Sequence, residues 1–150
     1  MKKIILGADH GGYELKNIIK FHLESKGFDV IDVGTNDAQS CDYPIFASRL
    51  CKKIQSGDSE LGILVCGTGI GMSMAANKHR GIRAACCSDT FSARLTRLHN
   101  NANVLCMGAR VVGAGLAIDL VEAFINAEFE GDRHIKRLSL IEDIENGKEL

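Results

Sequence analysis

The most informative stretch of the sequence is Cys66-Gly67-Thr68-Gly69-Ile70-Gly71, which closes a short apolar run. Its closely spaced glycines let backbone N–H groups approach a ligand, and the helix predicted to follow points its N-terminus at the same place. Thr68 adds a hydroxyl donor. The stretch therefore predicts a cradle for an anion or a developing oxyanion. A tight strand-to-helix turn that binds nothing is the plainer alternative.

Three known kinds of loop can be compared with this one by spacing. A P-loop requires Gly-Lys-Ser/Thr after its first glycines, whereas Gly71 is followed by Met72-Ser73. A dinucleotide fingerprint has glycine at its sixth position, where Met72 stands, although Asp89 lies about where a ribose-binding acid is expected. A cysteine phosphatase loop requires arginine at the position of Met72. A nucleotide-binding module that uses Asp89 remains an alternative.

Cys66 ends a predicted buried strand and faces the cradle. Helix N-termini favour the thiolate form of a cysteine, which serves as a nucleophile or a general base. Core packing is the equally weighted alternative when this residue is considered alone. The remaining cysteines form no Cys-x-x-Cys pair, which argues against a zinc site, and we expect them to be ordinary free thiols. They are Cys41, Cys51, Cys86, Cys87 and Cys106.

Other polar side chains suited to chemistry lie in three places. Asp9 and His10 follow the first apolar run, where they can orient each other or hold a hydroxyl and an anion. His99 lies near the end of a predicted helix, where the dipole favours the imidazolium form of a general acid. Arg133 and Arg137 are four residues apart on the last predicted helix, and two guanidinium groups on one face can grip a phosphate. Helix capping and an ordinary solvated surface are the structural alternatives for these residues.

These side chains are placed by a regular alternation of short apolar runs and helical patterns. Continuous apolar runs that are each followed by a helix predict a parallel sheet covered on both faces. In such α/β folds, ligands bind beyond the carboxyl ends of the strands. The predicted strands are Lys3–Leu6, Val30–Val33, Leu61–Cys66, Ile82–Cys87 and Val104–Met107. The predicted helices are Tyr13–Lys26, one from Pro44 to Gly57, one ending at His79, Asp89–His99, Val112–Ala127 and one over about 132–146.

Length and charge restrict the class of protein further. A chain of 150 residues fits a single domain, 1–150, which buries roughly 68–70% of its unfolded surface without needing disulfides. Lys and Arg number 18 and Asp and Glu 19, so no basic stripe suggests nucleic-acid binding and any anion site must be a local cluster. The first apolar run is too short for a signal peptide and no stretch is long enough for a membrane span. We expect a cytoplasmic protein with reduced thiols and no membrane partner.

Taken together, these segments resemble the ribose-5-phosphate isomerase B family, which also contains the galactose-6-phosphate isomerase subunits. The matching stretches span nearly the whole chain, and the glycine loop with its leading cysteine is the most specific of them. They are Gly7–Gly12, Asp42–Pro44, Cys66–Ser73, Ala75–Lys78, His99–Asn103, Gly108–Arg110 and Arg133–Arg137.

The resemblance implies a Rossmann-like three-layer αβα sandwich with a five-stranded parallel sheet and an extra C-terminal helix. It implies an aldose–ketose isomerase that interconverts ribose 5-phosphate and ribulose 5-phosphate through an enediolate. Six-carbon sugars such as allose or allose 6-phosphate are further candidate substrates. It also implies a homodimer or a dimer of dimers, with sites built across the interface and a C-terminal helix that reaches the partner subunit. No metal and no organic cofactor are implied. A sensor that binds ribose 5-phosphate without converting it is a second alternative.

The resemblance also implies catalytic roles. Cys66 matches the base that moves a proton between C1 and C2, in the branch of the family that has this cysteine instead of a glutamate at the position of Met72. Thr68 matches the hole for the enediolate oxygen, together with the backbone amides of Gly67, Gly69, Ile70 and Gly71. His99 matches the acid that helps to open the furanose ring, in a pairing with Asp9.

The remaining implied roles concern substrate binding. His10, Arg133 and Arg137 match contacts to the phosphate, and Tyr43, Asn100 and Arg110 match further substrate contacts. One departure precedes the basic pair, where Glu130-Gly131-Asp132 lacks the second glycine that relatives often carry. We expect this departure to alter the phosphate end of the site slightly.

Overall fold

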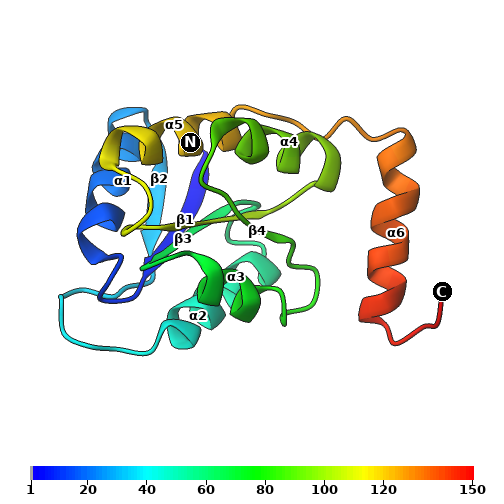
Figure 1. Ribbon diagram of the computed structural model, residues 1–150, viewed down its shortest axis with the longest axis horizontal. Helices are drawn as coiled ribbons and strands as arrows, with labels where there is room; N and C mark the ends of the chain where they lie inside the picture. The colour runs from blue at the N-terminus through cyan, green and yellow to red at the C-terminus, as the bar shows by residue number, and fades with distance from the viewer. Residues whose placement is uncertain (1) are drawn as a thin grey trace.

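A five-stranded parallel sheet forms the centre of the molecule in a computed structural model that describes residues 2–150 (Figure 1). The strand order is β2-β1-β3-β5-β4, and each neighbouring pair is parallel. The central strands are almost entirely buried, which explains their continuous apolar sequences. The strands are β1 (Lys3–Ala8), β2 (Asp29–Asp32), β3 (Gly62–Cys66), β4 (Ala84–Cys86) and β5 (Val104–Gly108).

Helices cover both faces of the sheet, as the alternation of patterns predicts. On one face, α1, α4 and α5 enclose a core that contains Ile19 and Phe124, and on the other α2 and α3 enclose a second core around Leu50 and Met72 (Figure 1). The predicted αβα sandwich is therefore confirmed. The helices are α1 (Tyr13–Ser25), α2 (Tyr43–Gln55), α3 (Ile70–Ala76), α4 (Thr90–Asn100), α5 (Ala114–Ile125) and α6 (Arg133–Glu145).

Three predicted elements are shorter by three residues or more than their apolar patterns suggest. The helix expected to reach His79 ends at Ala76, the strand expected over Ile82–Cys87 forms only at Ala84–Cys86, and the helix expected over Val112–Ala127 forms at Ala114–Ile125. The side chain of Asn77 joins the first two of these elements. Its Nδ2 donates to the carbonyl of Ala84 at 2.9 Å, and its Oδ1 accepts from the Ala84 N–H at 2.8 Å, so it occupies backbone groups of the edge strand.

The chain reverses its direction of travel across the sheet between β1 and β3. β2 lies on one side of β1, whereas β3 lies on its other side. In doubly wound sheets this reversal opens a crevice beyond the carboxyl ends of the two strands. Asp9 follows β1 and Gly67 follows β3, so the loops that carry them flank the crevice.

Helix α6 stands apart from the two helical layers, at the end of the sheet where the strands begin (Figure 1). Its last turn is tied to the turn before β4: the N–H of Gly81 donates to the carboxylate of Glu145 at 3.1 Å. Arg80 Nη1 also donates to Oδ1 of Asn146 at 2.6 Å. Among residues 2–150, no helix has both the length and the apolar character to cross a membrane.

Candidate active site

The candidate site lies at the carboxyl ends of β1, β3 and β5. Register pairs Cys66 with Gly108, and beyond this pair the N–H of Ala109 donates to the Cys66 carbonyl at 2.8 Å. The N–H of Arg110 donates to the Gly67 carbonyl at 3.0 Å. These bonds continue the sheet by one step and fix the start of the glycine loop against the end of β5.

The sulfur of Cys66 is held inside the glycine loop. The Cys66 side chain lies on the α2 and α3 face of the sheet, and the residue is only 5% exposed. Its Sγ accepts a hydrogen bond from the N–H of Gly69 at 3.1 Å. Gly69 has φ +80°, and a Cβ there would lie 2.8 Å from the carbonyl carbon of Met107. Only glycine fits this turn, and the turn aims an N–H donor at the sulfur.

Thr68 is exposed on the same loop. Its Oγ1 accepts a hydrogen bond from the N–H of Ile70 at 3.3 Å, which leaves its hydroxyl proton free to be donated elsewhere. A Cβ on Gly108 would lie 2.5 Å from Cα of Thr68. The backbone of Thr68 therefore packs directly on the end of β5, and this contact fixes the position of the glycine loop. Two predicted binding residues also reach it: a Cβ on Gly71 would lie 2.7 Å from the ring of Tyr43, and one on Gly67 would lie 3.6 Å from the guanidinium of Arg110.

Asp9 and His10 border the crevice from the β1 side. Asp9 is buried, and its Oδ1 accepts from the Gly12 N–H at 3.1 Å, so it orders the turn that leads into α1. His10 Nδ1 accepts from the N–H of Cys41 at 3.2 Å. The proton of a neutral His10 must then lie on Nε2, which makes this nitrogen a donor. The same turn approaches the glycine loop, because a Cβ on Gly11 would lie 3.5 Å from the N of Gly67.

Four predicted site residues lie at the other end of the sheet within one chain. α4 starts beyond the carboxyl end of β4 and leads the chain back to the start of β5, so its eleven residues carry His99 and Asn100 roughly 15 Å away along the helix axis. α6, with Arg133 and Arg137, stands at that same end (Figure 1). The expected pairing of His99 with Asp9 does not form within a single chain. A helix that follows a parallel strand returns the chain to the end of the sheet where the strands begin, whereas Asp9 lies at their carboxyl ends.

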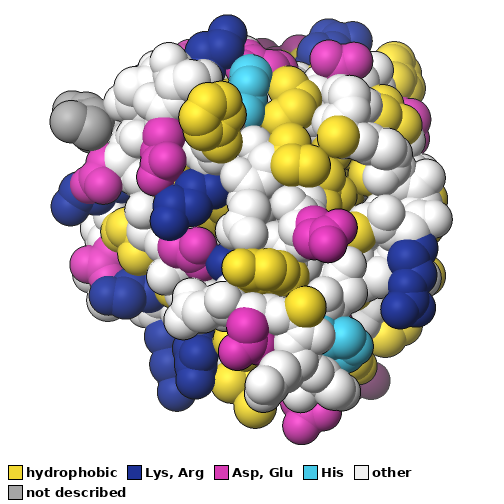
Figure 2. All heavy atoms as spheres, turned by 90° about the vertical axis from the view of Figure 1, so that its left-hand side faces the viewer, with side chains coloured by type: hydrophobic (Ala, Val, Ile, Leu, Met, Phe, Trp, Pro, Cys, Tyr) yellow, Lys and Arg dark blue, Asp and Glu magenta, His cyan; other side chains and the backbone are white. Residues whose placement is uncertain are grey.

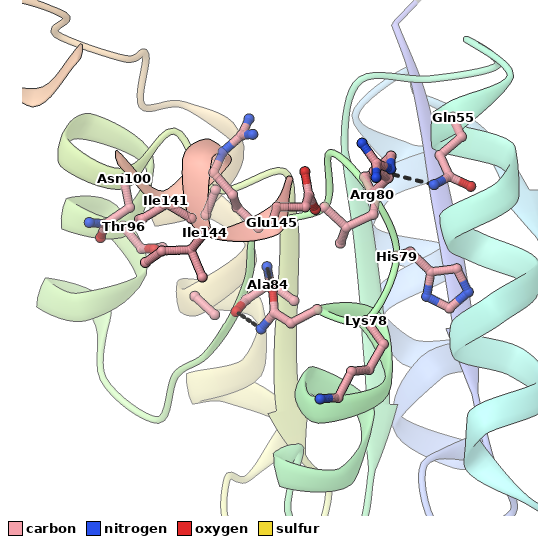
Figure 3. A pocket seen from close by; sticks show the side chains of 15 residues that line it. Gln55, Lys78, His79, Arg80, Ala84, Thr96, Asn100, Ile141, Ile144 and Glu145 are labelled. Carbon is pink, nitrogen blue, oxygen red and sulfur yellow. Dashed lines mark hydrogen bonds between the residues drawn. The ribbon is translucent and has the colours of Figure 1, made fainter. Parts of the chain in front are cut away.

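A cavity of about 950 Å³ lies beside α6 (Figure 3). Asn100 and Thr96 of α4, Ile141 and Ile144 of α6, and His79 line it. The labelled side chains come from both sides of a space that separates α6 from the rest of the fold (Figure 3). Asn100 therefore opens into this space and not into the crevice beside Cys66.

Four of the other cysteines lie in settings that disfavour a thiolate. Burial raises the pKa of Cys51 to about 12 and, with help from the neighbouring Cys86 and Asp89, that of Cys87 to about 11. Burial also raises the pKa of Cys106 well above its ordinary value and that of Cys86 in the same direction. All of the cysteines are free thiols.

The surface at the carboxyl ends of the strands carries side chains of both charges. Figure 2 views the molecule from this side and shows basic, acidic and hydrophobic side chains interspersed over the face.

Asp89 does not project toward the glycine loop as a ribose-binding acid, because its Oδ1 accepts from the N–H of Ser92 at 2.7 Å as the N-cap of α4. The structure thus removes the main support for a nucleotide-binding module.

Three features of the site were not identified from the sequence. The N–H of Cys41 fixes the tautomer of His10, the close approach of Gly108 sets the position of Thr68, and Glu130 lies beside His99. Gly108 belongs to a stretch that the sequence singled out, and Cys41 directly precedes another, Asp42–Pro44. Their contacts depend on strand pairing and on a loop conformation that the local sequence does not specify.

Comparison with known proteins assigns this arrangement to a class of isomerases. The model of a family described as Ribose/Galactose Isomerase matches residues 4–141. Ribose-5-phosphate isomerase B of Escherichia coli is 49% identical over 145 residues, which cover 97% of each chain. A putative sugar phosphate isomerase of Bacillus subtilis is 45% identical over 95% of this chain and 97% of its own.

Solved structures give the same assignment. A ribose-5-phosphate isomerase B of Clostridium thermocellum superposes with a TM-score of 0.96 at 48% identity, covering 97% of this chain and 98% of that one. That of Mycoplasma genitalium with bound ribulose-5-phosphate has a TM-score of 0.92 at 44% identity and covers 96% of each chain. The chain belongs to the ribose/galactose isomerase family, and the resemblance stated from its motifs is confirmed.

Proposed function

We propose that the protein is an aldose–ketose isomerase that interconverts ribose 5-phosphate and ribulose 5-phosphate, with Cys66 as the base. The observation that carries this proposal is the 3.1 Å hydrogen bond from the Gly69 N–H to the Cys66 sulfur, inside a loop of close backbone amides. A donor at this position stabilises negative charge on the sulfur. Family membership and the relatives named ribose-5-phosphate isomerase B support the choice of substrate.

The proposed chemistry begins with the open-chain aldose. The thiolate of Cys66 takes the proton from C2, the electron pair of that C–H bond forms the C1=C2 double bond, and negative charge collects on O1. The amides of the glycine loop and the hydroxyl of Thr68 hold this oxygen, and each such donor is worth about 2.7–4 kcal/mol in other enzymes. The thiol then returns the proton to C1, while a proton passes from O2 to O1, and the ketose forms.

The predicted site residues that lie far from Cys66 within one chain reach the site from a second copy of the chain. His99, Asn100, Arg133 and Arg137 lie at the start of the strands, whereas Cys66 lies at their carboxyl ends. In a homodimer, the phosphate is held by Arg133 and Arg137 of the partner subunit together with the Nε2–H of His10. His99 of the partner subunit supplies the acid that opens the furanose ring. Binding energy at the phosphate then orients the reacting carbons.

The substrate assignment is tested by turnover of ribose 5-phosphate, measured beside allose 6-phosphate, galactose 6-phosphate and free allose. We expect ribose 5-phosphate to have the highest kcat/KM. The ketose formed in D₂O should contain deuterium at C1 whenever the Cys66 thiol exchanges its proton with solvent before it returns that proton to the substrate. Saturable binding of ribose 5-phosphate with no product would instead identify a sensor and overturn the proposal.

Sharing of the site between subunits has its own test. Cys66→Ala and His99→Asn are each expected to be nearly inactive, so the two variants are unfolded, mixed and refolded together. Random pairing makes half of the dimers mixed, and each mixed dimer has one intact site, so activity should return to about a quarter of the wild-type value. No recovery in the refolded mixture would reject a shared site.

A further inference from the structure

Three ionisable side chains meet where the end of α4 approaches the start of α6. The imidazole rings of His99 and His134 are stacked, with their centroids 4.3 Å apart and their planes 15° from parallel. The Oε2 of Glu130 lies 3.6 Å from Nε2 of His99 and 3.8 Å from Nε2 of His134. The mechanism above uses only His99 of this group.

Glu130 and His134 are placed beside His99 in two different ways. The backbone N–H of Glu130 donates to the carbonyl of Leu98 at 3.0 Å, which ties the loop before α6 to the last turn of α4. The side chain of His134 is 8% exposed, whereas that of His99 is 32% exposed. The buried ring therefore supports one face of His99, and part of the His99 ring stays accessible to a reactant.

The charges around the stack distinguish the two histidines. Burial lowers the pKa of His134, and the positive charges of His99, Arg133 and Arg137 lower it further, while only Glu130 opposes them. Its Nε2 has no hydrogen-bond partner among the described residues. These charges and the burial favour the neutral form of His134, whereas the Glu130 carboxylate lies 3.6 Å from Nε2 of the more exposed His99.

The same three side chains are of the types that bind transition metals, and their ligand atoms lie within 4.8 Å of one another. A metal ion must lie along the in-plane lone pair of each imidazole that binds it. In a nearly parallel stack these lone pairs run side by side and do not converge. The observed geometry is that of one ring supporting another.

We propose that Glu130 and His134 are positioning residues that hold His99 in the orientation and protonation state needed for ring opening. This inference rests on the proposed role of His99 as the acid that opens the furanose ring. His134 supplies a flat, neutral, buried surface that fixes the plane of the His99 ring. Glu130 supplies the negative charge that keeps a proton on His99.

The test begins with Glu130→Gln, which preserves the shape of the side chain and removes its charge. We expect kcat with ribose 5-phosphate to fall by up to about fivefold, the range typical of an ion pair between partly exposed side chains, with little change in KM. The limb of the pH profile that reports loss of the acid's proton should move to lower pH. Glu128→Gln, an exposed glutamate of the same loop, is the matched control and should leave both quantities unchanged.

Variants of His134 separate support of the ring from general stability. His134→Ala should lower kcat, whereas His134→Phe, which keeps a flat ring in the stack, should restore most of the lost activity. Exchange of the C1 hydrogen of ribulose 5-phosphate with D₂O should continue in Glu130→Gln and His134→Ala, because this ketose is already open-chain and needs only the base. Loss of this exchange in both variants would indicate a structural role and overturn the proposal.

A double variant distinguishes this inference from the proposed function. If Glu130 acts through His99, then Glu130→Gln should cause no further loss in a His99→Asn background. A full additional loss in that background overturns the positioning role and leaves the role of His99 intact. Unchanged turnover of ribose 5-phosphate in His99→Asn itself would instead reject the role of His99 as the acid, and the positioning role with it.

Discussion

The backbone N–H of Gly69 points at the sulfur of Cys66 across 3.1 Å, and the positive φ of Gly69 makes this possible. An alanine at position 69 would place its Cβ against the backbone of β5, so this donor depends on glycine. Within residues 2–150, no backbone N–H donates to the sulfur of Cys51 or Cys87, and burial raises the pKa of these thiols to about 12 and about 11. Cys66 thus differs from these two buried thiols in having a backbone donor at its sulfur.

Replacing Cys66 by alanine should reduce kcat at least about a thousandfold, because a positioned general base contributes on the order of 10²–10⁴-fold. Steady-state assay of ribose 5-phosphate conversion measures the loss, and circular dichroism checks that the fold is intact. Cys51→Ala is the matched control, since this thiol lies on the buried face of α2 and takes no part in the proposed reaction. Turnover close to wild type in Cys66→Ala would reject this base.

Replacing Gly108 by alanine should displace Thr68 and lower kcat by about tenfold or more while the sheet remains folded. The added Cβ would lie 2.5 Å from Cα of Thr68, a distance that real structures do not allow. Gly115→Ala, at the start of α5, adds the same methyl group where no atom lies within 4 Å and should leave activity unchanged. Equal kcat values for both variants would show that the position of Thr68 relative to β5 does not affect catalysis.

Replacing Arg137 by alanine should raise KM for ribose 5-phosphate about tenfold or more, the worth of a lost charged hydrogen bond. A sugar without phosphate has no group for this side chain to hold, so the KM of free allose should change little. Lys136→Ala removes a neighbouring exposed charge from the same helix and serves as the control. If both sugars responded equally to Arg137→Ala, the residue would not be a phosphate ligand.

Replacing Asp132 by glycine should raise the free energy of unfolding by about 1 kcal/mol, because a non-glycine residue in a sparsely populated backbone region costs of order 1–3 kcal/mol. Asp132 has φ +48° and ψ −125°, a backbone conformation that glycine adopts more readily than a residue with a Cβ. Urea unfolding measures the gain. Asp132→Ala also removes the carboxylate but keeps a Cβ, so it should give no gain. A similar gain in the alanine variant would assign the effect to charge instead of backbone strain.

Much of the fold follows from local sequence. Continuous apolar runs followed by amphipathic helices predicted the parallel sheet and its two covers, and the glycines of the 67–71 loop predicted a close approach of backbone amides. The prediction failed at the edge of the sheet, where α3 ends before Asn77, and Asn77 bonds to the backbone of Ala84 at the start of a three-residue β4. A side chain that bonds to the backbone of an edge strand leaves no trace in hydrophobic periodicity.

The sequence by itself determined which residues have side chains suited to the proposed chemistry: a cysteine before a glycine-rich loop, a histidine at a helix end and two arginines on one helical face. Only the tertiary structure decided which of them meet. It brought Asp9, Cys66 and Gly108 together because the carboxyl ends of parallel strands lie at the same end of the sheet. It placed His99 at the opposite end of the sheet, where the ring stacks on His134. The reason is that a helix between two parallel strands must return the chain to the start of the next strand.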